Sequence, residues 1–410
     1  MNNPLESKAL RFIPFRKRDL VEMCLAEATL TGREAEFRSL ASMLASVYHF
    51  EFHQVLESLK DTYAALDPDA DTRPAPIAVD PGTDNFVDLL GGLLEKANYE
   101  RVTEADLNAA LEESSLFQIR LQVDFDDFSE VLLFCRGQST RRQTVSRWLG
   151  LSKKTIEFIN FERVVVYIRY RDQDAADPEN PAKAGATFLK LFQNVPKADL
   201  EMLFPNTRVR MRTIDKLLIG IPALVSGGIV LSTKLGATLI LLGSLIGFWL
   251  GLSSQPVELN KAAVTALVAG LAALGGYLWK QFNTFKNRKM RFMQALTRNL
   301  YFKNLDNNAG VFHRLANDAE EEECKEALLA YYFLHTAAGP LSRAELDKEV
   351  EQWLANRWDC KVDFEIDDAL EKLLTLELVQ EQAGRFTAIA MDAAIRKLDQ
   401  RWDDYFVPAA

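Results

Sequence analysis

The residues best suited to chemistry in this sequence are two histidines near its start. His49 and His53 stand four positions apart in YHFEFH, so on a helix both imidazoles would share one face and offer two metal ligands. A catalytic zinc needs a third protein ligand, which only a distant Asp67 or Asp69 would supply, and the segment lacks the HExxH pattern. Packing on neighbouring phenylalanines explains both histidines better. His49 and His53 are therefore weak metal candidates, and we predict no metal ion and no cofactor.

Acidic residues offer a second kind of chemistry, but their spacing does not favour it. The pairs Asp126-Asp127 and Asp367-Asp368 consist of adjacent residues, which diverge on a helix and on a strand. The run Glu320 to Glu323 is typical of the first turn of a helix, where negative charge is favoured. The sequence contains no P-loop, GxGxxG or GxSxG motif. It therefore gives no support to an enzymatic activity.

Bulk properties limit the class of protein further. A chain of 410 residues predicts two to three domains. The net charge of −10 argues against non-specific nucleic-acid binding, which needs a basic surface. The four cysteines are scattered without a CxxC pair, so we expect neither a disulfide framework nor a metal knuckle, and the soluble parts fit a reducing compartment. The first twenty residues lack the apolar core of a signal peptide and carry two acidic residues that transit peptides avoid.

Two soluble regions precede the middle of the chain. Residues 1–115 form a helical N-terminal region, since Leu40, Leu44 and Val47 recur at helical spacing. Residues 116–205 form a small α/β region, because VLLFCRG and VVVYIRYR have strand composition. Between these strands lies RRQTVSRWLGLSKK, whose basic residues could contact phosphates. A solvated loop, or an edge strand protected by charge, explains this run better.

Residues 300–410 have the layout of an acidic winged-helix-like domain. We expect a helix from about Asn317, a second helix opened by a Ser342–Glu345 capping box, and a third from Ile366 to Leu376. A hairpin around Ala383-Gly384 and a last helix complete it. The third helix of such a domain often reads DNA, yet here its sequence DFEIDDALEKL is acidic and would repel phosphate. The domain is therefore predicted to contact protein, or to serve structural packing alone, and not to bind nucleic acid.

The middle of the chain, residues 206–291, is predicted to be a membrane region. Its apolar segments cover 217–232, 235–253 and 262–279, and a transmembrane helix needs about 20 mostly apolar residues. Both flanks are basic, which places both on the cytoplasmic side and favours two crossings over three. The basic residues predicted to contact lipid headgroups are Arg208, Arg210, Arg212, Lys216, Lys286, Arg288 and Lys289.

Small residues within these segments predict helix packing. Gly236, Gly243, Gly247 and Gly251 follow a spacing of seven and four residues, which allows close approach of helix backbones. Packing within one hairpin is the favoured explanation, and a homo-oligomer interface is the alternative. No carboxylate or histidine lies inside the apolar runs, so the region is expected to act as an anchor and not as an ion pathway.

Several motifs together carry a family resemblance. RFIPFRKRDL, DFDDFSEVLLFCRG and FLKLFQNVPKADLEMLFPNTRVRM before the apolar region, and LYFKNLDNNAGVFHRLANDAEEEECKEALLAYYFL after it, resemble the transmembrane protein 143-like family of mitochondrial and bacterial membrane proteins. The resemblance covers nearly the whole chain and implies large soluble domains around a hydrophobic hairpin. It brings no activity, substrate or catalytic residue. Without a transit peptide, it favours a bacterial inner-membrane protein over a mitochondrial one.

These observations lead to one prediction for the whole chain. The fold is α+β with a transmembrane helical hairpin, and both termini are cytoplasmic in a multi-pass protein. The leading function is a non-enzymatic, membrane-anchored scaffold with membrane lipids, a protein partner for the C-terminal domain and a possible second copy as its partners. The alternative is a membrane-surface enzyme or lipid-handling protein. Its site would lie where the segments flanking the apolar region converge, at Asp199, Glu201, Arg208, Asn304 and Asn307.

Overall fold

A computed structural model describes the chain over most of its length. The described residues are 9–69, 73, 85–103, 120–147, 152–171, 185–206, 208–210, 236–251, 300–406 and isolated positions between 261 and 294. Within them the protein has an α+β fold with antiparallel sheets. The chain divides into two compact units, of which the first combines residues 1–114, 124–204 and 303–410, and the second combines 115–123 and 205–302.

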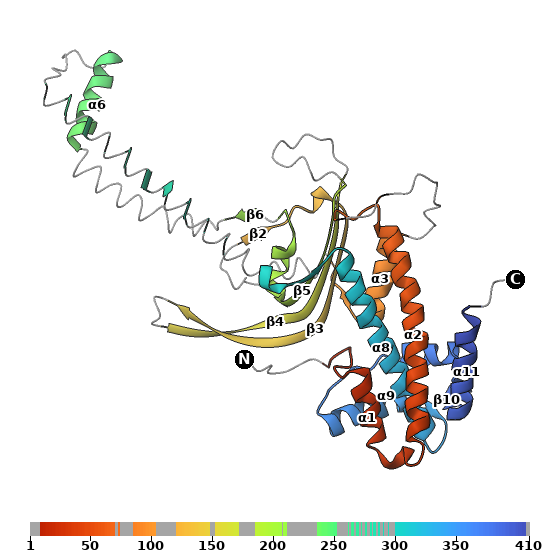
Figure 1. Ribbon diagram of the computed structural model, residues 1–410. Coiled ribbons are helices and arrows are strands. Elements are labelled where there is room, and N and C mark those ends of the chain that lie inside the picture. The colour runs from red at the N-terminus through yellow and green to blue at the C-terminus, as the bar shows by residue number, and fades with distance from the viewer. Residues whose placement is uncertain are drawn as a thin grey trace. The chain divides into compact units, whose positions relative to one another are not determined.

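Helices form one layer of the first unit around the 28-residue α8 (Ala309–Thr336). α2 (Glu34–Tyr63) packs along α8, and shorter helices complete the layer (Figure 1). Leu40, Leu44 and Val47 of α2 are fully buried, so the predicted helical spacing marks the core-facing side of this helix. The shorter helices are α1 (Lys17–Leu25), the 3-10 helix η1 (Ala28–Leu30), α3 (Phe86–Lys96) and the C-terminal α11 (Met391–Asp404).

A five-stranded sheet packs against this helical layer. Its order is β1-β3-β4-β5-β7, and every neighbouring pair is antiparallel. A short 3-10 helix, η2 (Phe125–Asp127), leads into the longest strand. The strands are β1 (Glu100–Arg101), β3 (Phe128–Arg147), β4 (Ser152–Tyr170), β5 (Thr187–Pro196) and β7 (Asn304–Asn307). The basic run between the predicted strands therefore extends β3 and β4 for most of its length.

The two faces of the sheet are covered by different elements. Val165 and Tyr167 of β4 belong to the apolar core that the sheet shares with the helices. The alternate residues Val164 and Val166 are equally buried but lie outside that core. They occupy the opposite face, where the 3-10 helix η3 (Lys197–Leu203) contacts β4 and β5. The sheet is therefore a central layer with helices on one face and η3 on the other.

The C-terminal part of the first unit follows the predicted order of helices and hairpin. After α8 come β8 (Leu341–Ser342), α9 (Arg343–Trp358), α10 (Ile366–Thr375), β9 (Val379–Gln382) and β10 (Arg385–Ala388). The three strands form an antiparallel sheet in the order β8-β10-β9. The Ser342 hydroxyl accepts from the Glu345 N–H, and the Glu345 carboxylate accepts from the Ser342 N–H, so the predicted capping box is confirmed.

The run Glu320 to Glu323 lies in the middle of a helix and not in a first helical turn, and Glu322 and Glu323 are buried. α8 begins at Ala309, so the predicted start near Asn317 is wrong and the run falls in the middle of the helix. The Glu322 carboxylate accepts from the Ile13 N–H at 2.9 Å and pairs with Lys325 at 2.8 Å. Lys325 Nζ donates to the Ile13 carbonyl at 2.6 Å. The backbone of Ile13 therefore forms hydrogen bonds with Glu322 and Lys325, whereas the sequence predicted that the helix dipole stabilises the glutamates.

A second group of buried charges surrounds Lys372 of α10. Its Nζ lies 2.8 Å from Glu323 Oε2, 2.8 Å from Glu326 Oε2 and 2.6 Å from Asp368 Oδ2. Asn98 Nδ2 also donates to Glu326 at 2.8 Å. Burial raises the pKa of Glu326 to about 7, while the charge of Lys372 acts in the opposite direction. This cluster ties α8 to α10 and to the segment that leads into β1.

The second unit does not contain the predicted transmembrane hairpin in its described residues. β2 (Arg120–Gln122) and β6 (Arg208–Arg210) form a two-stranded sheet, and α6 (Gly236–Trp249) is a 14-residue helix. No helix in the described part of the chain is long and apolar enough to cross a membrane. The predicted hairpin and multi-pass inner-membrane localisation are contradicted on this ground. The apolar segment 217–232 and most of 262–279 lie outside the described residues.

The residues predicted to act within that membrane region are only partly described. A Cβ built on Gly243 or Gly247 of α6, or on Gly251, would meet no described atom within 4 Å. Gly236 is the first residue of α6. Lys286 is exposed, whereas Arg212, Lys216, Arg288 and Lys289 lie outside the described residues. The predicted lipid contacts rested on the transmembrane hairpin, and they lose their basis with it.

Candidate functional site

Strand pairing brings together the two segments that flank the second unit. β5 pairs with β7, so that Leu191 lies opposite Asp306 and Phe192 lies opposite Asn304. η3 follows β5 directly and packs on the same sheet. The chain therefore leaves the first unit after η3 and re-enters it beside β5, as the convergence of the two motifs predicts.

Asp199 on η3 is a buried carboxylate with one ionic partner. It is 3 % exposed, and Lys303 Nζ lies 4.0 Å from its Oδ2. Its Oδ1 is buried and accepts no hydrogen bond from the described residues. Burial raises the pKa of Asp199 to about 6, although the positive charge of Lys303 opposes this change. Burial also lowers the pKa of Lys303.

Glu201 adds a second carboxyl two residues along η3. It is 9 % exposed. Burial raises its pKa to about 7, and the negative charge of Asp199 acts in the same direction. Both carboxyl groups therefore exchange protons at a pH where surface carboxyls are fully ionised. This behaviour is typical of functional groups, although structural ion pairs also produce it.

The remaining predicted residues occupy different surroundings. Asn304 in β7 has a buried Oδ1 without a donor among the described residues. Asn307 lies opposite Lys190 at the exposed end of β7. Arg208 belongs to β6 of the second unit, where its backbone pairs with Gln122.

We define the η3 cluster as Asp199, Glu201, Lys303 and Asn304. Sequence reasoning missed Lys303, although its position next to Asn304 and its charge opposite to that of Asp199 could have identified it.

The two histidines lie on α2 but form no metal site. His49 Nδ1 lies 2.9 Å from Glu320 Oε2, and His53 Nδ1 lies 3.9 Å from Glu57 Oε1. Both side chains are more than half exposed. Within the described residues, no three His, Cys, Asp or Glu side chains are placed to hold a metal ion. Each histidine therefore has one carboxylate neighbour, and the described residues do not gather the three protein ligands of a catalytic zinc site around either histidine.

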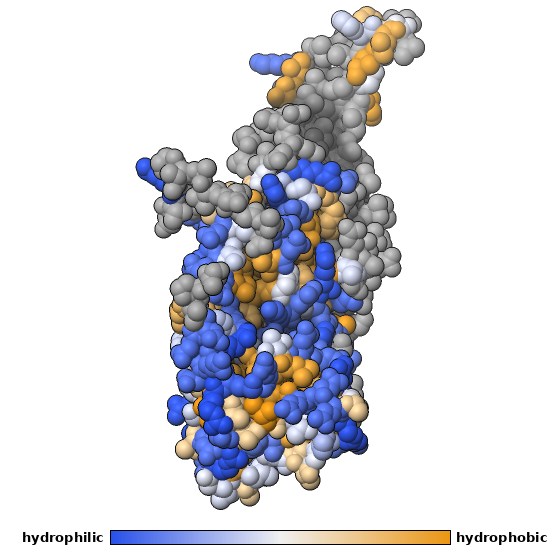
Figure 2. Space-filling view, turned by 90° about the vertical axis from the view of Figure 1, so that its right-hand side faces the viewer, coloured by the Kyte–Doolittle hydropathy of each residue, from blue (hydrophilic) through white to orange (hydrophobic). Residues whose placement is uncertain are grey.

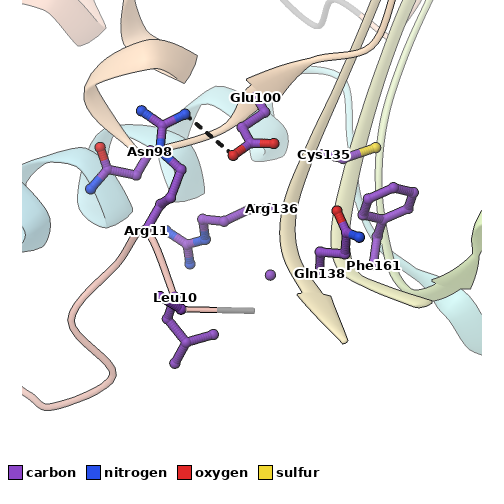
Figure 3. A pocket seen from close by; sticks show the side chains of 10 residues that line it. Leu10, Arg11, Asn98, Glu100, Cys135, Arg136, Gln138 and Phe161 are labelled. Atoms are coloured by element: carbon purple, nitrogen blue, oxygen red, sulfur yellow. Dashed lines mark hydrogen bonds and ion pairs between the residues drawn. The ribbon is translucent and has the colours of Figure 1, made fainter. Parts of the chain in front are cut away.

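A small pocket opens between the N-terminal segment and the edge of the sheet (Figure 3). Its volume of about 30 Å³ is large enough to hold water. Arg11 at its rim pairs with Glu100 at 3.3 Å. Arg136 donates to the Ala97 carbonyl at 3.1 Å and lies 3.4 Å from Asp318. Both guanidinium groups are used by internal partners, so the pocket is a packing feature of this unit.

Acidic side chains crowd one surface of α9 and α10. Residues 341–406 contain sixteen Asp and Glu against nine Lys and Arg, a net charge of −7. Burial raises the pKa of Asp347 to about 6, and the charges of Glu351, Asp363 and Asp367 add to this effect. Asp347 Oδ1 accepts no hydrogen bond from the described residues. Arg343 pairs with Asp367, which leaves the charge of this group of carboxylates only partly neutralised.

The side of the helical layer that carries α2 and α11 combines polar and apolar areas (Figure 2). Figure 2 views the molecule from the side on which α2 and α11 lie in Figure 1, and its surface there is mainly hydrophilic with smaller apolar areas. Phe50 of α2 forms ring contacts with Tyr405 at 4.6 Å and with Phe406 at 5.2 Å. Phe406 is 63 % exposed. This aromatic group mainly fastens α11 to α2.

Comparison with known proteins gives one family match and no structural match. A family model described as a protein of unknown function (DUF3754) matches residues 161–310. No solved structure matches this chain. The matched range begins within β4 and ends within α8, and it contains all four residues of the η3 cluster. The chain is thus similar to that family over the segments that converge at η3.

Proposed function

We propose that the protein is a non-enzymatic partner-binding protein whose acidic surface on α9 and α10 takes a basic segment of another protein. We define this acidic surface as Asp347, Glu351, Asp363 and Asp367. The observation that carries the proposal is the position of Asp347 beside three other carboxylates, with its buried Oδ1 accepting no hydrogen bond from the described residues. Its raised pKa has burial as the largest cause and the charges of the three neighbours as the next. Like charges held together in the free protein favour an approaching cation, because a positive partner removes their mutual repulsion.

The chemistry of this surface also limits the partner. An acidic helix repels phosphate, so nucleic acid is excluded as the occupant. Asp363 and Asp367 are exposed, so lysine or arginine side chains of a partner can reach them, although Asp367 already pairs with Arg343 within this chain. Complementary charge of this kind steers association and sets specificity, and it weakens as salt is added. A flexible or extended basic segment of a protein fits these requirements.

Binding of a short fluorescent lysine-rich peptide to the full chain tests the proposal. Asp347→Asn, Asp363→Asn and Asp367→Asn together should weaken binding about tenfold, a cost of about 1.4 kcal/mol. The matched control removes the same number of charges at Glu381, Asp399 and Asp403, which are exposed elsewhere on the same region. The control should change the affinity less than about twofold. Equal weakening by both variants, or no binding at low salt, would overturn the proposal.

A ligand-binding or acid–base role of the η3 cluster is a second candidate function. Its support is the buried, unpartnered Oδ1 of Asp199 beside a lysine with a lowered pKa. Native mass spectrometry of the gently purified chain tests this candidate. A small molecule that is retained by the protein and lost in Lys303→Met would establish it. Protein that carries no such molecule would leave partner binding as the function.

A further inference from the structure

The far ends of β3 and β4 form a two-stranded ribbon. The two strands pair from Phe128↔Tyr170 to Arg147↔Ser152. β5 accompanies β4 only as far as Asn160, and β1 meets β3 only at Phe134 and Cys135. Residues 139–147 and 152–159, which we call the β3–β4 ribbon, therefore have no third strand among the described residues. Figure 1 shows this part of the hairpin running out beyond β5, away from α2 and α8.

A ribbon of this kind is marginally stable alone and gains from a partner. Two strands without a third strand or a covering helix bury too little apolar surface for independent stability. Phe158 and Ile159 are only partly buried. Arg141 Nη2 donates to Asn194 Oδ1 at 2.9 Å, which fastens the base of the ribbon to β5. Beyond this contact, the backbone pairs of the described residues join only the two strands to each other.

The charge of the ribbon is opposite to that of the rest of the chain. Residues 139–159 contain five basic residues and one acidic residue, a net charge of +4. Because the whole chain has a net charge of −10, the remaining residues carry −14. Arg142 pairs with Glu157 at 2.5 Å, which neutralises one basic residue. The basic residues are Arg141, Arg142, Arg147, Lys153 and Lys154.

We infer that the β3–β4 ribbon docks on the acidic surface of a second copy of this chain. The inference rests on the proposed function and names the partner for that surface. The ribbon runs away from α8, the helix on which α9 and α10 pack (Figure 1). Two copies related by a two-fold axis satisfy both contacts at once, because each gives a ribbon and receives one.

Reversal of charge on each side tests this pairing directly. The ribbon variant carries Arg142→Glu, Lys153→Glu and Lys154→Glu, and the surface variant carries Asp363→Lys and Asp367→Lys. Sedimentation equilibrium of the full chain at about 50 µM should show a dimer at about 50 mM salt and a monomer at about 500 mM. Each variant alone should have a dimer dissociation constant at least about tenfold higher. An equimolar mixture should restore the dimer, because the reversed ribbon then meets the reversed surface.

The controls separate misfolding from loss of docking. Glu381→Lys with Asp399→Lys changes the net charge equally outside the acidic surface and should leave the dimer intact. The ribbon variant and the surface variant should both keep the circular dichroism spectrum and the melting temperature of the wild type. If the ribbon variant does not fold, the milder double variant Lys153→Gln with Lys154→Gln replaces it. A chain that stays monomeric at low salt, or variants that do not rescue each other, overturns the inference. Binding of the lysine-rich peptide by such a monomer would leave the proposed function standing.

Discussion

Asp199 and Glu201 bind protons more tightly in the folded chain than in the unfolded chain. Burial raises their pKa values to about 6 and about 7. A raised carboxyl pKa stabilises the fold at low pH, and this contribution disappears as the pH rises through the folded pKa. The η3 cluster therefore favours the folded state below about pH 4, and it loses that advantage progressively toward pH 7.

Glu201→Gln should remove one of these two contributions. We expect the variant to match the wild type near pH 4 and to exceed its free energy of unfolding by about 1 kcal/mol near pH 8. Urea titrations at several pH values measure the difference. Glu57→Gln is the control, because Lys60 holds the pKa of the exposed Glu57 below its usual value. A gain of stability at high pH in the control as well would remove the argument for burial at Glu201.

Lys372 is the residue whose loss should cost most. Lys372→Met leaves Glu323, Glu326 and Asp368 without their shared cation, which should lower the free energy of unfolding by about 3 to 5 kcal/mol. The loss should be smaller near pH 5 than near pH 8, because carboxyl groups without a cation can then take up protons. Lys397→Met, which removes an exposed partner of Glu377, should have little effect. Equal losses at both pH values would contradict this account of the cluster.

The sequence predicts that Asp199 and Asn304 lie close together, but it does not predict which groups pair with the buried charges. The prediction for Asp199 and Asn304 came from the two sequence motifs that flank the apolar region. Glu322 accepts from the Ile13 N–H, about three hundred positions away on the N-terminal segment, and Glu323 pairs with Lys372, about fifty positions away on α10. The run of four glutamates favoured a solvated first helical turn in the sequence analysis. Helix propensity and the helix dipole depend on neighbouring residues only, so they do not predict cations from distant parts of the chain.

Elements with a local signal were predicted well, and those decided by tertiary contacts were not. The capping box at Ser342 depends on two residues of one turn, and it is present. The basic run at residues 141–154 has no clear period, so the sequence did not distinguish a loop from an edge strand. Pairing between β3 and β4 makes most of this run a strand. Apolar composition predicted transmembrane helices, yet α6 ends after 14 residues, at Trp249.

Gly137 permits a conformation of β3 that other residues resist. Its φ is +72°, and an added Cβ would lie 2.8 Å from Glu162 Cγ and 2.9 Å from Glu162 Cβ on β4. Gly137→Ala should therefore lower the free energy of unfolding by about 1 to 2 kcal/mol. Gly92→Ala on α3 is the matched substitution, since no atom lies within 4 Å of its added Cβ. It should stabilise the helix by about 0.5 to 1 kcal/mol, and equal signs for the two variants would contradict the backbone argument.

At the scale of the whole molecule, one compact unit is assembled from both ends of the chain. Residues 1–114, 124–204 and 303–410 share it, so the predicted N-terminal and C-terminal regions are neighbours in space. α2 packs along α8, and the Ile13 backbone is held by Glu322 and Lys325. An isolated C-terminal segment would expose this buried face of α8 to water, and its glutamates would lose the hydrogen bonds from Ile13 and Asn98 while keeping Lys325 and Lys372.

Fragments of the chain should therefore fold together and not apart. Residues 300–410 alone should show reduced helicity and no cooperative thermal transition, because α8 loses the apolar contacts of α2 and the hydrogen bonds that Ile13 and Asn98 give to its buried glutamates. Addition of residues 1–115 should restore part of the helicity, and the two fragments should migrate as one species in size-exclusion chromatography. Lys372→Met in the 300–410 fragment should leave this association intact only at low pH, since Glu326 must then be neutral to remain buried. A cooperative transition in residues 300–410 alone would show instead that the C-terminal region is an independent domain, with α8 stabilised by α9 and α10.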